Sequence, residues 1–396
     1  MAIDFNHWGS GFDAYMTAFA GRFPRIEPRR RASHYVRGLL SELDPKNGWT
    51  IAADAGERSP VGMQRLLNAS PWDEGGVRDD LRAIVTGVIG DTESGILVVD
   101  DVGFPKKGDK SAGVAKIRSS STGKMEGRQI GVFLAYTSPA GHALIDRELY
   151  LPAEWTDDPD RRAGAGIPGE VTFATEAELA QRMIERARAA RTPFGWVTAD
   201  EVYGQATSLR DYLEAKGISY VMAIPAAEIV PTDPQGAATA TAATLETPLP
   251  RANADERGKD PPRRAEWEAI PFTAPERQRG HRYLLMQRSS DGSFDGRRRF
   301  ICYSGAPTSI EQLVRVATSH WTIEECIHTG RNDAGLDQYQ VRDYTAWYRH
   351  ITLSMVALAF LTLIETARER DPVINPPFPI PLVGNENDNV PNSAPS

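Results

Sequence analysis

Two aspartates close apolar runs that are typical of buried strands. Asp100 ends the run ILVVD at 96–100 and is followed by Asp101, and Asp200 ends FGWVTAD at 194–200. In open α/β sheets, functional side chains gather at the carboxyl ends of strands. A single acid at a strand end is more often a turn or helix-cap residue, but two such ends in one chain favour a shared acidic site.

A helix near the C-terminus offers a third carboxylate. The capping pattern TSIE at 308–311 predicts a helix that runs to about residue 330. On this helix Glu324 falls in the middle of the apolar stripe, whereas Glu325 falls at its edge. A carboxylate on a buried face is costly unless it is paired. Two interpretations stay open for Glu324: a basic partner such as Arg331, with His328 beside it, or a metal ion.

Carboxylates that meet at one sheet edge suit hard divalent cations such as Mg²⁺, with Mn²⁺ as a further candidate. Two such ions about 3.5–4 Å apart activate the attacking oxygen and stabilise the leaving oxygen in phosphoryl transfer. Other chemistries find little support, because the chain has no HExxH pair, no complete phosphate-binding P-loop and no GxSxG turn. Cys302, Cys326, His320 and His328 do not have a common zinc-ligand spacing, so we expect buried thiols and helix-surface histidines.

Basic residues gather in two segments of a chain whose net charge is −8. Six arginines face one glutamate in residues 22–37, among them Arg29, Arg30 and Arg31. Seven basic residues face two acids in residues 104–128, namely Lys106, Lys107, Lys110, Lys116, Arg118, Lys124 and Arg128. Each segment is either a solvated surface or a contact for phosphate groups. The second segment follows Asp100 directly, where it would attract a polyanion that the acids alone repel.

The order of the expected elements indicates an α/β fold. The first ninety residues have helical periodicity, and a β-rich region with two helices follows. We expect strands at 96–100, 130–137, 143–151, 194–200 and 218–224, a helix opened by the capping box of Thr175 and Glu178, and a second helix at 208–216. Three strands followed by alternating helix and strand predict a mixed sheet with helices packed on it.

The composition and the apolar runs indicate in which cellular compartment the protein is expected. Two cysteines in 396 residues exclude a disulfide framework and predict an intracellular protein. The longest apolar run, 351–364, is shorter than the roughly 18 residues that a membrane span needs. The N-terminus lacks the pattern of a signal peptide. We therefore expect a cytoplasmic protein without membrane contact.

Five ordered motifs carry a resemblance to a known family. They are DDVGFPKKG (100–108), GVFLAYTSPAGHALIDRELYLP (131–152), TADEVYG (198–204), HWTIEECIHTGRNDAGLDQYQVR (320–342) and WYRHITLSMVALAF (347–360). The chain resembles the DDE transposases of bacterial insertion sequences, and within them the group known as IS-seven-oh-one-like. This resemblance implies a ribonuclease-H-like core and a triad of Asp100, Asp200 and Glu324 that holds two Mg²⁺ ions. Asp101 stays an alternative to Asp100.

The same resemblance also implies DNA contacts. Arg331, His328 and the basic residues of 106–128 are expected to contact phosphate, and Arg29, Arg30 and Arg31 to help recognise the DNA ends. In related transposases the glutamate helix carries a Tyr, an Arg and a Lys, but this chain has Ala317, His320 and Arg331 there. The loop 116–122 and Glu201 also depart from the family pattern. These departures concern the DNA contacts more than the triad.

With this resemblance, the chain divides into expected regions. They are a helical DNA-binding domain (1–90), the first part of the catalytic core (91–227), an insertion with a low-complexity segment at 231–264 and a β-hairpin of 282–288 with 298–304 (228–305), the C-terminal helices of the core (306–370) and a disordered tail (371–396). The expected activity is that of a homodimeric transposase, which binds terminal inverted repeats in double-stranded DNA, cleaves them and joins the 3′ ends to target DNA. An inactive transposase-derived DNA-binding regulator and a nuclease without strand transfer remain alternatives.

Overall fold

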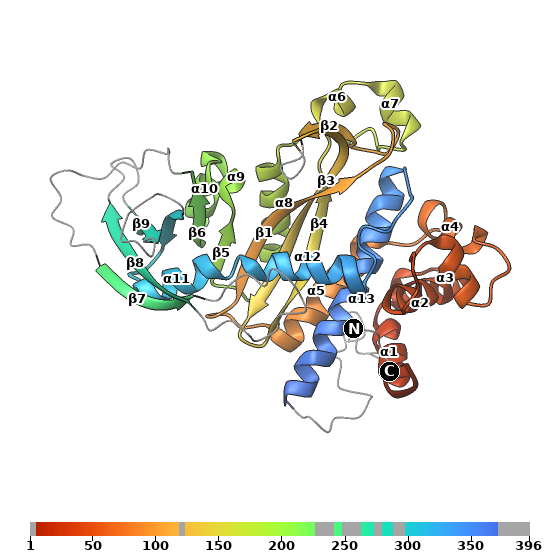
Figure 1. Ribbon diagram of the computed structural model, residues 1–396, viewed down its shortest axis with the longest axis horizontal. Coiled ribbons are helices and arrows are strands. Elements are labelled where there is room, and N and C mark those ends of the chain that lie inside the picture. Colours follow the sequence, from red (N-terminus) through yellow and green to blue (C-terminus); the bar gives the residue numbers. More distant parts are fainter. Residues whose placement is uncertain are drawn as a thin grey trace, which may run out of the picture.

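A computed structural model describes residues 5–118, 123–225, 241–247, 263–272, 279–287 and 298–370 (Figure 1). Its helices are α1 (Phe5–Ala18), η1 (Ala20–Arg22), α2 (Ile26–Leu40), α3 (Gly48–Asp54), α4 (Val61–Asn68), α5 (Glu74–Ile89), α6 (Ala153–Thr156), α7 (Pro159–Gly164), α8 (Glu176–Ala189), α9 (Glu201–Gly204), α10 (Thr207–Ala215), α11 (Ile310–Thr318), α12 (Trp321–Asp333) and α13 (Tyr344–Arg370). Its strands are β1 (Ile96–Pro105), β2 (Ala115–Arg118), β3 (Met125–Ser138), β4 (Gly141–Leu149), β5 (Trp196–Ala199), β6 (Ser219–Ile224), β7 (Thr241–Thr247), β8 (Arg263–Phe272), β9 (His281–Gln287) and β10 (Arg299–Ser304).

One mixed sheet carries all of these strands. Its centre consists of β1, β5 and β6, which run parallel. On one side β3 pairs antiparallel with β1, and β2 and β4 pair with β3. On the other side β10 pairs antiparallel with β6, and β9, β8 and β7 follow. This order confirms the expected α/β fold with a mixed sheet, and it agrees with the ribonuclease-H-like core that the resemblance implied.

Burial of the central strands provides a rigid base for the acids. The side chains from Ile96 to Val99 are at most 2% exposed, as are those of Val197 and Ala199. Parallel strands that are covered on both faces need such continuous apolar runs. Each fully buried Val or Leu side chain contributes about 1.5–3 kcal/mol relative to an exposed one. The positions of Asp100 and Asp200 are therefore fixed by two well-packed strands.

Helices cover both faces of the central strands. On one face, α8 packs on β1, β3 and β4, and it begins at the predicted capping box, in which the Glu178 carboxylate accepts a hydrogen bond from the Thr175 backbone N–H at 2.8 Å. On the other face, α12 packs on β1, β3, β4 and α13. The N-terminal helices α2, α4 and α5 pack against α13, which confirms that the first ninety residues are mostly helical.

The helix α13 is longer than its apolar run suggested. It is long and apolar enough to cross a membrane by length and composition, over Tyr344–Arg368. However, 83% of its most apolar window is buried inside the fold. Such burial is the environment of a core helix, and the contacts of α13 with α2, α5 and β4 agree with it.

The helix expected at 308–330 is two helices. Ser309, not Thr308, is the N-cap of α11, because its hydroxyl accepts a hydrogen bond from the Gln312 N–H at 3.3 Å. The chain breaks before α12, where the hydroxyls of Thr318 and Ser319 donate to the carbonyls of residues 314 and 316 at 2.8 and 2.7 Å. Side-chain hydroxyls that donate to backbone carbonyls in this way compete with the backbone hydrogen bonds of a helix. The continuous apolar stripe inferred from the sequence was therefore wrong.

Two further expectations change, and a third is confirmed. The strand β1 continues to Pro105, so that Asp100 lies within the strand and not at its end. The segment 231–264 is not all linker, because β7 lies in it and pairs antiparallel with β8. The expected hairpin is confirmed as the antiparallel pair β9 and β10. The rest of the segment 231–264, residues 119–122 and the tail at 371–396 lie outside the described residues, apart from the first residues of β8.

Candidate active site

A cavity of about 510 Å³ lies where β1, β5 and α12 meet. Its walls include all three predicted acids, Asp100, Asp200 and Glu324. The strand β1 supplies the first, the turn after β5 the second and α12 the third. Residues that are 100 and 124 positions apart in the sequence thus line one cavity.

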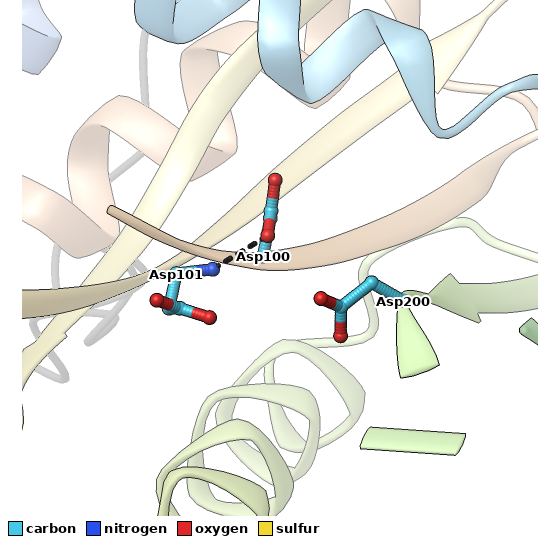
Figure 2. A group of neighbouring side chains, drawn as sticks. All are labelled: Asp100, Asp101 and Asp200. Atoms are coloured by element: carbon cyan, nitrogen blue, oxygen red, sulfur yellow. Dashed lines mark hydrogen bonds between the residues drawn. The ribbon is translucent and has the colours of Figure 1, made fainter. Parts of the chain in front are cut away.

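Asp100 and Asp101 point to opposite faces of β1, because consecutive side chains of a strand alternate. Figure 2 shows the Asp100 carboxylate on the side of α12 and the Asp101 carboxylate on the other side, with Asp200 facing the space between them. Each of these aspartates offers a carboxylate oxygen, and the three oxygens lie within 4.8 Å of one another. The Asp101 backbone N–H donates to Oδ1 of Asp100 at 2.8 Å, which orients that carboxylate.

Asp200 is held by the start of α9. It is the N-cap of this helix, and its Oδ1 accepts hydrogen bonds from the N–H groups of Val202 at 3.0 Å and Tyr203 at 3.5 Å. The expectation that this residue caps a helix is therefore confirmed, and its role in a metal site stays a prediction. The cap fixes one carboxylate oxygen in place, which orients the whole group toward Asp100 and Asp101.

Mutual repulsion and burial act on these acids. Burial raises the pKa of Asp100 well above its ordinary value, and Asp200, Asp101 and Glu324 raise it further. Burial and Asp200 raise the pKa of Asp101 to about 6. Several carboxylates packed in this way are unfavourable as anions unless a cation lies among them. Their all-oxygen donor set is the one that Mg²⁺ and Mn²⁺ prefer, so the residues fit a divalent metal site.

Glu324 occupies a different position from the one expected. The buried face of α12 contains Thr322, Ile323, Cys326 and Ile327, and Glu324 is exposed on the side that lines the cavity. Among the described residues, the acids that approach within 4.8 Å are the three aspartates, and Glu324 lies outside that group. Its neighbour Glu325 turns away to Nε2 of His142 at 3.6 Å. Glu324 therefore faces the cavity as an exposed carboxylate, and it does not carry the cost of a buried charge that the sequence suggested.

His320 belongs to the cavity and not to the helix surface, which corrects the expectation. Its Nε2 lies 3.7 Å from Oδ2 of Asp100, and 23% of its side chain is exposed. Its Nδ1 is buried without a hydrogen-bond partner. Burial lowers the pKa of His320, although Glu324 and Asp200 oppose the shift. The sequence feature that could have pointed to this residue is its place where related transposases carry an arginine.

Arg298 also lines the cavity, together with Arg299 at the start of β10. Both arginines come from the insertion, which the sequence did not connect with the acids. A guanidinium beside a carboxylate cavity can bind the phosphate of a substrate and offset the negative charge of the acids. The cysteines behave as predicted, since Cys302 and Cys326 are free and buried.

Near Asp101, on the α8 side of β1, lies a further acid that the sequence did not indicate. Glu176 is the first residue of α8, and burial, followed by the nearby Asp101 and Asp200, raises its pKa to about 7. The hydroxyl of Tyr203 is buried beside these groups without a hydrogen-bond partner. Burial raises the Tyr203 pKa, and Asp101 and Glu176 raise it further. No pattern in the sequence pointed to Glu176, because it follows an ordinary capping residue.

The basic residues that were expected to contact phosphate fall into two groups. Some are engaged within the protein: Arg31 with Glu57 at 2.9 Å, Arg128 with Glu126 at 3.1 Å, His328 with Asn332 at 2.9 Å, and Arg331 with the Gly103 carbonyl at 3.3 Å and Asp337 at 3.8 Å. Arg29 is half-buried, whereas Arg30, Lys107, Lys110, Lys116, Arg118 and Lys124 are exposed, although Arg118 also donates to the Gly123 carbonyl at 3.2 Å. The exposed group remains the better candidate for direct phosphate contact.

Lys106 is not a simple surface lysine. Its Nζ lies 3.2 Å from the centre of the Tyr339 ring and donates to the Tyr339 carbonyl at 3.4 Å. Desolvation lowers the pKa of Lys106 to about 7, although Asp337 opposes the shift. The charge of this residue therefore depends on what binds beside it.

Known proteins share parts of this sequence. Residues 18–289 match the model of a family described as DDE superfamily endonuclease. This match includes Asp100 and Asp200 and ends before Glu324. The chain is also similar to the probable transposase for insertion sequence element IS701 of Microchaete diplosiphon, with 25% identity over 221 residues. That alignment covers 54% of this chain and 53% of the relative, so it spans about half the length of each.

Proposed function

Because the chain belongs to the DDE superfamily of endonucleases, we propose that it is the transposase of an insertion sequence. It would bind the terminal inverted repeats of its element, cleave the DNA at their ends and join the freed 3′-hydroxyl groups to target DNA. The observation that carries this proposal is the meeting of Asp100, Asp200 and Glu324 on one cavity. The similarity to a probable transposase supports the same activity.

The acids would hold two divalent ions, Mg²⁺ or Mn²⁺. Asp100 and Asp200 offer oxygens within 4.8 Å of each other, and Glu324 lines the same wall. When bound, such ions supply an activated oxygen nucleophile and stabilise the leaving oxygen. The α9 cap keeps Asp200 in position, and the hydrogen bond from the Asp101 N–H keeps Asp100 in position. The chain thus provides a preorganised set of oxygens.

Positive groups around the cavity would bind the DNA backbone. Arg298 and Arg299 lie on the cavity wall, and exposed lysines follow β1. The N-terminal helices, with Arg30 exposed on α2, would contribute to end recognition. Two ends must be processed for each element, and the described residues form one acidic cavity of this kind, so we propose that a homodimer acts on double-stranded DNA in the bacterial cytoplasm.

Cleavage by conservative variants tests the proposal. Asp200→Asn keeps the α9 cap, because Asn and Asp are comparable N-caps, whereas Ala would also cost about 0.5–2 kcal/mol of stability. In a nicking assay with labelled terminal repeats and Mg²⁺, Asp100→Asn, Asp200→Asn and Glu324→Gln should lose cleavage. Binding of the repeats should stay within a few-fold of that of the unmodified protein. Glu201→Gln, a change on the same cavity wall, is the matched control and should still cleave.

The outcomes separate the alternatives. Cleavage that survives Asp200→Asn would refute the assigned site. An unmodified protein that binds the repeats but does not nick them with Mg²⁺ or Mn²⁺ would be a DNA-binding regulator. Joining of pre-cut 3′ ends to a second DNA distinguishes a transposase from a nuclease without strand transfer.

A further inference from the structure

A second cavity lies at the junction of the N-terminal helices and the segment after α12. It has a volume of about 190 Å³ and is lined by residues of α2, α3, α4 and the segment 338–341. None of its lining residues lines the acidic cavity. Met63 and Leu67 form an apolar part, and Tyr35, whose hydroxyl bonds to Nδ1 of His350 at 2.9 Å, belongs to another wall.

Trp49 on α3 stands at this cavity with its ring open to water. It is 65% exposed, whereas Trp8, Trp155, Trp267 and Trp347 are fully buried. An exposed indole presents a flat apolar surface that water solvates poorly. Such a surface beside a cavity is suited to stack with a planar ring of a ligand, and nucleobases stack on aromatic side chains in this way.

Carboxamides supply most of the polar groups of this cavity. Its lining includes Asn47, Gln64, Asn68, Gln338 and Gln340. Asn47 uses its Oδ1 to accept from the N–H groups of Trp49 at 2.9 Å and Thr50 at 3.2 Å. Gln338 uses its Oε1 to accept from the Lys46 N–H at 2.6 Å. With both carbonyl oxygens held by the backbone, the amino groups of Asn47 and Gln338 are left as oriented donors. Such amino groups can donate to the acceptor atoms of base edges, such as N7 of a purine.

The segment that carries Gln338 is itself held firmly. The ammonium group of Lys46 is buried and donates to the carbonyls of Leu39 and Asp333, each at 2.7 Å. These bonds tie α2 to the end of α12. The donors of the cavity are therefore preorganised, which lowers the ordering cost of binding.

The cavity is within reach of DNA that occupies the acidic site. From Asp100 to Pro105 the strand β1 spans about 17 Å at 3.3–3.4 Å per residue. The next residue, Lys106, lies over the ring of Tyr339, which lines the second cavity. DNA that is cleaved at Asp100 and runs along β1 would therefore approach the edge of this cavity at Tyr339.

We propose that this cavity binds one nucleobase of the DNA end, stacked on Trp49 and contacted by the amino groups of Asn47 and Gln338. The inference rests on the proposed function, because it takes DNA as the substrate. It adds a specific contact to the general role that the basic residues have in binding phosphate. The site would distinguish the ends of the element from other DNA at one base.

Binding of abasic duplexes tests this site with the full chain. The probes are duplexes of the terminal repeat that flanks the gene, in each of which one base is removed. On the intact duplex, Trp49→Ala should weaken binding roughly 5- to 150-fold, the range for loss of one base–aromatic stack. On the duplex that lacks the bound base, Trp49→Ala and the unmodified protein should bind equally. Trp49→Phe, which keeps a ring, should retain most of the affinity.

The control and the opposing results follow from the same assay. Ile26→Ala, on α2 and outside the cavity, removes a side chain that is 66% exposed and should not change binding. Equal binding of every duplex by Trp49→Ala and the unmodified protein would overturn the inference. So would a loss of the same size on all abasic duplexes, because the defect would then not depend on one base. If only this inference is wrong, the unmodified protein will still cleave the repeats. If the proposed function is wrong, the unmodified protein will not cleave them.

Discussion

Asp100 and Asp101 are consecutive residues of β1 whose carboxylates lie on opposite faces of the sheet (Figure 2). Asp100 faces the cavity that Glu324 and His320 line, and Asp101 lies on the side of α8, where Glu176 begins the helix. Asp200 approaches both aspartates. The acids thus form two groups on opposite faces of the sheet, and Asp200 belongs to both groups. Asp100 is the aspartate that shares a cavity with Glu324, which favours it over Asp101 as the first acid of the proposed triad.

Removal of one charge from this cluster should stabilise the protein in the absence of metal. The pKa of Asp101 is raised to about 6, so its ionisation disfavours the folded state, and the metal-free protein should lose stability as the pH rises from about 4 through 6. We expect Asp101→Asn to exceed the unmodified protein by about 1–3 kcal/mol at pH 8 and to match it at pH 4. Urea unfolding in EDTA at both pH values measures this difference.

Mg²⁺ should reduce that difference in stability. At pH 8 the ion should raise the stability of the unmodified protein more than that of Asp101→Asn, since the cation offsets the repulsion that the substitution removes. Glu170→Gln, a change of an exposed acid outside the cluster, should leave stability unchanged with and without the ion. A lower stability of Asp101→Asn at pH 8 in EDTA would show that the carboxylate is not repelled in the folded state.

Glu176, at the start of α8, should help the nearby acids to bind a divalent cation. Its raised pKa of about 7 reflects burial and the proximity of Asp101 and Asp200, so a bound divalent cation should displace its proton. We expect Glu176→Gln to reduce Mn²⁺ affinity and cleavage by about 10- to 100-fold, the usual cost of losing an outer-shell partner. The unmodified protein should release more protons on binding Mn²⁺ at pH 6.5 than this variant does. Calorimetric titration in two buffers of different ionisation enthalpy measures both quantities.

Glu178→Gln provides the matched control for that change. Glu178 is two residues further along α8, and a glutamine at this position also completes a capping box. This variant should bind Mn²⁺ and cleave DNA as the unmodified protein does. Equal proton release by the unmodified protein and Glu176→Gln would disconnect Glu176 from the metal.

Sequence patterns predicted the parts of this molecule that depend on local chemistry. The apolar runs that end at Asp100 and Asp200, the capping box at Thr175 and the buried cysteines are confirmed, because burial and capping leave direct signals in residue type. The break before α12 was missed, since hydroxyl groups of Thr318 and Ser319 do not exclude a helix by themselves. Its consequence was the wrong expectation that Glu324 lies on a buried face.

Partners supplied by distant elements were the hardest to predict. His320 faces Asp100 only because α12 begins at Trp321 and lies across β1, and Arg298 reaches the cavity only because β10 pairs with β6. Neither relationship follows from periodicity, which describes one element at a time. Glu176 reaches Asp101 for the same kind of reason, through the packing of α8 on β1.

Lys106 should make DNA binding depend on pH. Its lowered pKa of about 7 means that the ammonium form predominates at pH 6 and the neutral amine at pH 8.5. Because phosphate attracts the charged form, affinity for the terminal repeat should fall as the pH rises over this range. In Lys106→Met this dependence should disappear, whereas Lys107→Met, which changes an exposed neighbour, should lose a similar factor at both pH values. Fluorescence anisotropy at fixed ionic strength measures these affinities, and an unchanged pH profile in Lys106→Met would contradict the assignment.

Asp146 on β4 should be essential for stability rather than for DNA binding. Its buried carboxylate contacts Arg78 and Arg186, each at 2.9 Å, and these arginines lower its pKa against the effect of burial. The stabilisation is therefore complete at pH 7 and is lost only as the pH falls below the ordinary range of an aspartate. Asp146→Asn removes the buried anion that Arg78 and Arg186 share, leaves them only Asp79 and Glu148 as carboxylate partners, and should cost about 3–5 kcal/mol in urea unfolding at pH 7. Glu185→Gln, which breaks the exposed pair with Arg188 on the same helix as Arg186, should cost less than about 1 kcal/mol. A loss of similar size in both variants would mean that burial does not distinguish the two ion pairs.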